Sequence, residues 1–169
     1  MSMYSQFATD TNLERAGIDL DYGEFRVRIA RAGGSNKRYA RVLETKMKPH
    51  RRALQAETLD PKRAERLLVE SYAEGVILEW AVSVVADAKG APKEPLVLAS
   101  AHLKKTGKEA PNTVFVKGIE SPTGDVLAFT VENVVDTLIA LPDLFTDIRE
   151  QASKAGLFRE QALEEDAGN

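Results

Sequence analysis

Apolar residues recur at every third or fourth position along two long stretches of this 169-residue sequence. In the first stretch they are Tyr39, Val42, Leu43 and Met47, then Leu67, Leu68, Tyr72, Val76 and Trp80. In the second they are Val134, Val135, Leu138 and Ile139, then Leu144, Phe145, Ile148, Ala152 and Ala155. This spacing places apolar side chains along one face of a helix. The sequence therefore predicts helices over most of residues 36–80 and 130–162.

Helix-start signals divide these stretches. Asp60 precedes Pro61, so the carboxylate can cap a helix whose first residue needs no backbone donor, and this helix is expected to reach about residue 80. Thr130 is placed to cap the next helix, and Leu141-Pro142 separates it from a last one. Gly75, inside the helix before residue 80, predicts the close approach of another element.

One segment alternates instead. Phe25, Val27 and Ile29 take turns with Arg26 and Arg28, which predicts a half-buried strand ending before Gly33-Gly34, with Ser35 capping the following helix. Residues 81–123 hold four of the seven prolines and several short β-like runs. We therefore predict an α+β fold that is predominantly helical, with a short N-terminal strand, a helical core and a β-containing middle insertion.

The domain organisation follows from these shifts in pattern. Residues 1–22 show no clear period and are expected to form a flexible N-terminal arm. Residues 23–169 are expected to form a single domain, within which residues 81–123 are a β-rich insertion or a long excursion.

The composition excludes several kinds of site. The chain has no cysteine and two histidines, His50 and His102, with no second ligand at metal-binding spacing. Gly33-Gly34 lacks the spacing of a phosphate-binding loop, and the carboxylate pairs Asp143/Asp147 and Glu160/Glu164 fit a solvated helix face. We therefore expect no enzyme activity, no cofactor and no metal. The absence of a long apolar run or a signal-peptide pattern predicts a soluble cytoplasmic protein.

Charge is unevenly distributed. Residues 25–66 carry thirteen basic and four acidic residues, whereas residues 128–169 carry nine acidic and three basic ones. Two interpretations stay open: a partner that neutralises one end, or basic and acidic helices that face each other. Basic residues can also neutralise phosphates, so a nucleic-acid-binding accessory protein using residues 26–66 is an alternative function, although the overall acidity makes nucleic acid an unexpected partner.

Several runs together resemble the tail assembly chaperones of long-tailed bacteriophages and prophages. They are residues 24–39 (EFRVRIARAGGSNKRY), 48–52 (KPHRR), 141–153 (LPDLFTDIREQAS) and 157–159 (LFR), with an acidic and apolar segment ending at Trp80. The resemblance covers about residues 22–80 and 124–166. Residues 81–123 are longer than the short turn usual in that family.

The resemblance implies a non-enzymatic protein that binds the tape measure protein, a long helical chain, and keeps it soluble while tail tube subunits polymerise around it. It implies action in the host bacterial cytoplasm and absence from the mature virion. The tail tube protein and a second copy of the chain are further candidate partners, and no membrane is involved. A head–tail joining component that stays in the virion is another alternative.

A chaperone that binds the tape measure protein, its client, requires exposed apolar surface. The helix from Leu141 to Ala162 is the best candidate, with Leu157 and Phe158 projecting from its end. Basic side chains add selectivity or speed of encounter: Lys37, Arg38, Arg41, Arg51 and Arg52. Trp80 and Phe145, in contrast, are expected to be buried.

Overall fold

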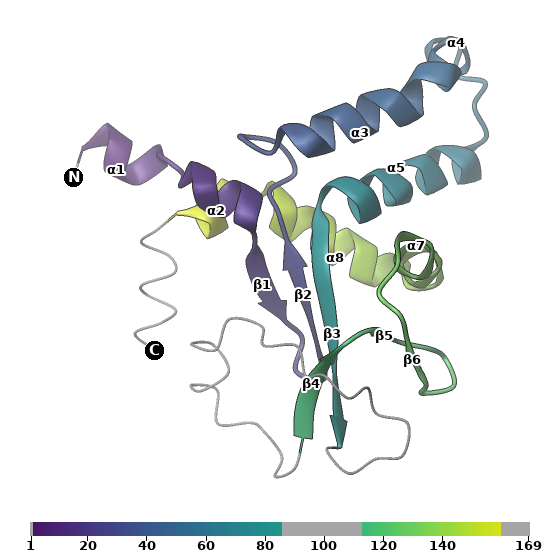
Figure 1. Ribbon diagram of the computed structural model, residues 1–169. Helices are drawn as coiled ribbons and strands as arrows, with labels where there is room; N and C mark the ends of the chain where they lie inside the picture. Colours follow the sequence, from purple (N-terminus) through teal and green to yellow (C-terminus); the bar gives the residue numbers. More distant parts are fainter. Residues whose placement is uncertain (1, 86–112, 160–169) are drawn as a thin grey trace.

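The computed structural model describes residues 2–85 and 113–159, and its centre is a four-stranded antiparallel sheet (Figure 1). The strands are β1 (Ile18–Asp21), β2 (Phe25–Ile29), β3 (Ile77–Val85) and β4 (Thr113–Lys117), and they lie in the order β1-β2-β3-β4. A small hairpin, β5 (Ile119–Glu120) and β6 (Val126–Leu127), follows β4. Together with the helices this confirms the predicted α+β fold.

Helices precede, interrupt and follow the sheet. The α-helices are α1 (Met3–Phe7), α2 (Thr11–Ala16), α3 (Lys37–Met47), α4 (Arg51–Gln55), α5 (Pro61–Gly75), α7 (Val131–Ala140) and α8 (Pro142–Ser153), and the 3-10 turns are η1 (Lys48–His50) and η2 (Ala155–Phe158). The predicted starts of two helices are confirmed, because Asp60 caps α5 and Thr130 caps α7 through their side chains. The capping prediction for Ser35 is wrong: Asn36 precedes α3, and the Ser35 hydroxyl donates instead to the Thr11 carbonyl.

The core lies between one face of the sheet and helices α5, α7 and α8. Val27 and Ile29 of β2 and Trp80 of β3 are fully or almost fully buried there, as are Phe145 and Ile148 of α8. The predicted burial of Trp80 and Phe145 is therefore confirmed. Burying a large apolar side chain contributes about 1.5–3 kcal/mol, so this layer supplies much of the folding free energy.

The other face of the sheet carries charge. Arg28 lies between Asp19 of β1 and Glu79 of β3, at 2.9 and 3.4 Å, because these residues are direct cross-strand neighbours. Arg26, one pair further along, reaches Asp21 at 3.5 Å and lies over the ring of Phe115 at 4.0 Å. Opposite charges on adjacent strands stabilise the pairing and fix its register.

The helix predicted to run to residue 80 ends earlier. Helix α5 stops at Gly75, and Trp80 lies in β3 with Val82 and Val84 on the same face. A spacing of four fits both a helical turn and a strand, so Tyr72, Val76 and Trp80 looked continuous although the chain changes structure between them. The predicted close approach at Gly75 is confirmed: a Cβ there would lie 2.8 Å from the Tyr39 Cα, on α3 beside α5 (Figure 1).

The segment expected to be an arm is partly folded into the domain. Asp10 caps α2, and β1 pairs with β2 along its whole length. Glu14 of α2 is buried, where its carboxylate accepts hydrogen bonds from Thr9, Arg31 and the backbone N–H of Ser35. Within residues 2–22, helix α1 has no buried residue. These contacts were not predicted from residues 1–22 because single residues make them, and no periodic apolar face marks them in the sequence.

Both ends of the predicted insertion 81–123 belong to the main sheet. Residues 81–85 complete β3, and residues 113–117 form β4, which pairs with β3 from Ala81↔Lys117 to Val85↔Thr113. Residues 86–112 of that segment lie outside the described residues. In the described chain no helix combines the length and the apolar character needed to cross a membrane.

Candidate functional site

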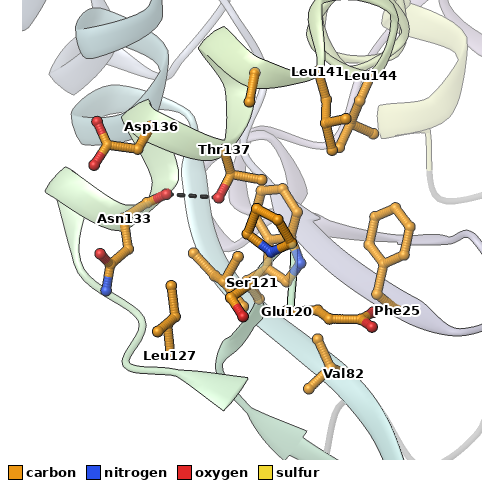
Figure 2. A pocket seen from close by; sticks show the side chains of 14 residues that line it. Phe25, Val82, Glu120, Ser121, Leu127, Asn133, Asp136, Thr137, Leu141 and Leu144 are labelled. Carbon is orange, nitrogen blue, oxygen red and sulfur yellow. Dashed lines mark hydrogen bonds between the residues drawn. The ribbon is translucent and has the colours of Figure 1, made fainter. Parts of the chain in front are cut away.

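An apolar pocket of about 410 Å³ opens between the sheet, the β5–β6 hairpin and the α7–α8 junction. Its lining residues are Phe25, Trp80, Val82, Ile119, Glu120, Ser121, Pro122, Leu127, Asn133, Asp136, Thr137, Ala140, Leu141 and Leu144. Figure 2 shows Leu141 and Leu144 reaching down from the helices, with Phe25 and Val82 of the sheet across the hollow from them. Pockets of this size and character commonly bind ligands or apolar side chains of a partner.

Local sequence explains why three elements converge here. Gly118, with φ +155°, turns the chain from β4 directly into the hairpin, and a Cβ there would lie 2.7 Å from the Leu127 carbonyl oxygen. Thr130 then starts α7, which runs beside the hairpin. Leu141 ends α7 and immediately precedes α8, since Pro142 can open a helix but cannot continue one. The Leu141 side chain is left at the pocket mouth by this junction.

The floor of the pocket is an aromatic row. The ring of Phe25 stacks on Trp80 with centroids 5.8 Å apart, and Tyr22 stacks on the other side of Phe25 at 4.7 Å. The Tyr22 hydroxyl donates to Asp147 of α8 over 2.6 Å. Each ring is thus held by a neighbour, so the floor is formed before any partner arrives.

Polar groups on the α7 side are mostly engaged. The Thr137 hydroxyl donates to the Asn133 carbonyl, drawn as a dashed line in Figure 2, and the Asn133 amide donates to the Ala128 carbonyl. Unlike Thr137 and Asn133, the carboxylates of Glu120 and Asp136 are not engaged in this way: both residues are exposed, and neither makes an ion pair within residues 2–85 and 113–159. The pocket therefore has an apolar floor and two unneutralised negative charges at its edge.

Apolar side chains continue outside the pocket. Leu141 is 50% exposed and Leu127 is 38% exposed, and both also line the pocket. Val131 and Ile139 on α7 are similarly exposed but do not line the pocket. Exposed apolar residues that join a hollow are typical of a surface for another macromolecule. The described residues hold no group of three or more His, Cys, Asp or Glu side chains that could bind a metal ion.

The basic residues predicted as a partner site lie on another part of the surface. Lys37, Arg38 and Arg41 of α3 and Arg51 and Arg52 of α4 are all exposed, and none of them lines the pocket. Arg51 pairs with Glu44 at 3.3 Å. One interpretation of the uneven charge was that the basic and acidic helices face each other. Among the described ion pairs, none joins α3 or α4 to α7 or α8. Lys46 of α3 pairs instead with Glu70 and Glu74 of α5.

The expectation that Leu157 and Phe158 project from a helix is wrong for Phe158. Helix α8 ends at Ser153, and the η2 turn folds Phe158 into the core, where its side chain is fully buried. Leu157 is half-buried and packs against the same core. The backbone N–H of Asp10 donates a hydrogen bond to the Phe158 carbonyl, which ties this turn to the start of α2.

The pocket itself was not predicted from the sequence. Its residues come from β2, β3, the hairpin and the α7–α8 junction, so no single stretch displays it. The one local signal was the pair Leu127 and Leu141, which fall outside the apolar faces of the neighbouring elements and are left exposed.

Comparison with known proteins gives one match. Residues 116–169 match the family described as the YdaY prophage protein, a range that includes β5, β6, α7, α8 and most of the pocket lining. No curated protein and no solved structure matches the chain. The match covers less than half of the chain, so it shows that this C-terminal segment is similar to a prophage protein family.

Proposed function

We propose that this protein is a prophage tail assembly chaperone, which binds the tape measure protein and keeps it soluble while the tail tube polymerises. The single observation that carries the proposal is the open apolar pocket, with Leu127 and Leu141 exposed at its mouth. Soluble proteins rarely leave such surface bare unless a partner covers it. The resemblance of residues 24–39 and 141–153 to tail assembly chaperones supplies the identity of that partner.

The fold suits a holding function. The pocket floor is formed by stacked rings, and its mouth lies between a helix and a hairpin, so a segment of the tape measure protein can enter and leave without unfolding the domain. Helices that lay an apolar face in such a groove bind through a few anchoring side chains. In this proposed function the protein has no catalytic activity and needs no cofactor. It acts in the host cytoplasm and is released before the virion matures.

Co-expression tests the proposal. The chain is produced with the tape measure protein encoded beside it, and the soluble fraction is purified through a tag on the chaperone. We expect the wild type to keep the client soluble and to co-purify with it. Leu141→Asp should lose most of the captured client, because it places a charge at the pocket mouth, while keeping its own thermal transition.

Leu54→Asp is the matched control. Leu54 is also an exposed leucine, at 40%, but it lies on α4 and does not line the pocket. This variant should capture the client as well as the wild type does. A wild type that leaves the client insoluble, or equal capture by Leu141→Asp and the wild type, contradicts the proposal.

The basic surface supports a second candidate function, nucleic-acid binding, because five predicted basic residues are exposed on α3 and α4. Against it, Tyr72 is buried, and the partly buried Tyr39 packs edge-on against it with ring centroids 5.2 Å apart, so neither ring is presented as an open stacking platform. Titration with duplex and single-stranded DNA decides between the two. Binding at physiological salt that weakens steeply as salt rises would favour the nucleic-acid function.

Two further expectations concern the assembled phage. A head–tail joining component would be found in purified particles, whereas a chaperone would be absent from them; mass spectrometry of the particles distinguishes these alternatives. The tail tube protein and a second copy of the chain are additional proposed partners, and pull-down and light scattering test them.

A further inference from the structure

The mouth of the pocket lies in a segment whose charged residues are all acidic. Residues 119–144, which form the hairpin, α7 and the start of α8, contain five acidic residues and no lysine, arginine or histidine. They are Glu120, Asp125, Glu132, Asp136 and Asp143. All five are exposed, and none makes an ion pair within the described residues.

Two of these acids are at the pocket itself. Glu120 follows Ile119 on the hairpin, and Asp136 lies on α7 one turn before Ala140, so carboxylates flank the apolar hollow from two elements. Figure 2 shows Asp136 and Glu120 on different sides of the hollow. A bound anion or acidic segment would be repelled there, whereas a cationic side chain beside an apolar anchor would gain attraction from both edges.

We propose that the pocket accepts a basic amphipathic helix: its apolar side chains enter the hollow between Trp80, Leu127 and Leu141, and lysine or arginine side chains next to them pair with Glu120 and Asp136. This inference rests on the proposed function for the source of the helix, the tape measure protein. The preference for basic flanks rests on the charges of the pocket alone.

Shape favours a helix as the occupant. The mouth is bounded along one side by α7, whose lining residues Asn133, Asp136, Thr137 and Ala140 recur at helical spacing and form one face of that helix. A helix presents apolar residues at i, i+3, i+4 and i+7, so it can lie along this face and place its apolar side chains in the hollow. Charged side chains at the flanking positions then lie over the rim and fix orientation and register.

Trp80 makes the test direct. It is the single tryptophan of the chain and it lines the pocket, so its fluorescence reports on occupancy. The probes are two synthetic helical peptides of about 15 residues without tryptophan. Both carry leucines on one face, and lysines flank this face in the first peptide and glutamates in the second. Fluorescence titration and calorimetry measure the affinity of each.

We expect the lysine peptide to bind at least about tenfold more tightly than the glutamate peptide, a difference of about 1.4 kcal/mol, and to weaken as salt rises. The double variant Glu120→Lys with Asp136→Lys should reverse this order. The control is Glu65→Lys with Glu150→Lys, which changes the net charge equally at two exposed positions outside the pocket and should keep the wild-type order.

Any of three binding results would overturn the inference. They are no binding of the lysine peptide, equal affinity for the two peptides, or an equal effect of the control double variant. Self-association of the wild type that Glu120→Lys with Asp136→Lys abolishes would also overturn it, because a second copy would then occupy the pocket.

The same double variant, co-expressed with the tape measure protein, separates this inference from the proposed function. If the wild type fails to hold the tape measure protein but the peptide preference stands, the proposed function fails and the pocket chemistry holds. If the wild type captures the client and both double variants do so equally, the proposed function stands and the charge preference fails.

Discussion

The hydroxyl of Tyr22 donates a hydrogen bond to the Asp147 carboxylate over 2.6 Å, joining the β1–β2 turn to α8 across 125 positions of sequence. Burial raises the pKa of Tyr22, and the neighbouring carboxylate raises it further, so the phenol stays protonated and keeps donating. Because the Tyr22 ring stacks on Phe25 and Phe25 stacks on Trp80, this single bond holds one end of the row of rings beneath the pocket.

Tyr22→Phe tests the role of that bond. The variant keeps the ring but loses the donor, so the free energy of unfolding should fall by about 1–2 kcal/mol, as expected for a part-buried hydrogen bond to a charged acceptor. Urea denaturation measures the change. Tyr4→Phe is the control, since Tyr4 is 75% exposed and should have an unchanged midpoint. Equal midpoints for both variants would mean that the bond adds no stability.

Gly75 is a point of close approach between α5 and α3. A Cβ on this glycine would lie 2.8 Å from the Tyr39 Cα, a backbone atom that cannot move aside alone. Gly75→Ala should therefore lower the free energy of unfolding by about 1–3 kcal/mol, even though alanine favours helix. Thermal denaturation followed by circular dichroism measures the loss.

Gly156→Ala is the matched control for that substitution. Gly156 lies in η2, has nothing within 4 Å of the added Cβ, and does not have a positive φ. The melting temperature of this variant should stay at or slightly above that of the wild type. A Gly75→Ala protein that is more stable than the wild type would show that α3 and α5 separate without cost.

Glu14 gives the fold a pH dependence. Burial raises the pKa of its carboxyl, but hydrogen bonds from Thr9, Arg31 and Ser35 outweigh burial and leave the pKa below its ordinary value of 4.5. A folded-state pKa below the unfolded one stabilises the fold above the unfolded pKa, and this contribution is lost as pH falls through the folded pKa. Stability should therefore decline below about pH 4.5 partly because of Glu14.

Glu14→Gln should remove that part of the acid response. At pH 7 the variant should be about 2 kcal/mol less stable, because an amide cannot pair with the Arg31 charge, and the gap to the wild type should narrow as the pH falls toward 3. Denaturant melts over this pH range measure the gap. The control Glu65→Gln changes an exposed carboxylate and should follow the wild-type curve. A stability difference that stays constant with pH would mean that ionisation of the Glu14 carboxyl does not contribute to the loss of stability in acid.

The parts of the fold that sequence predicted are those with an uninterrupted period or a defined cap. The strand at Phe25–Ile29 and the starts of α5 and α7 are of this kind, as is the close approach at Gly75. The switch from α5 to β3 was missed because residues spaced by four fit either structure. Strand β1 was missed because its four residues IDLD are half charged, and its pairing with β2 depends on Asp19 meeting Arg28 across the sheet.

The candidate site was less accessible to sequence reasoning. The basic residues of α3 and α4 were recognised because charge can be counted, and they are exposed as expected. The pocket depends on Phe25 and Leu141 meeting across more than a hundred positions, which tertiary packing alone decides. Phe158 was assigned to the surface because its helix was extended too far; the η2 turn that buries it depends on the long-range bond to Asp10.

Because Phe158 is buried away from the pocket and Leu141 lies at its mouth, substituting each residue should affect stability and client capture differently. Phe158→Ala removes a fully buried ring and should cost about 3–5 kcal/mol of unfolding free energy. Leu141→Ala, at a half-exposed position on the pocket mouth, should cost less than about 1 kcal/mol. Denaturant titration measures both values.

The loss of client capture should be larger for Leu141→Ala than for Phe158→Ala, the reverse of their effects on stability. The two variants are compared at a temperature where each is folded. Phe158→Ala should hold the tape measure protein nearly as well as the wild type, because its ring touches the core and not the pocket. Leu141→Ala should hold less, since it removes apolar surface from the mouth. A Phe158→Ala variant with an unchanged melting temperature and no client capture would place the binding surface at η2 and exclude the pocket.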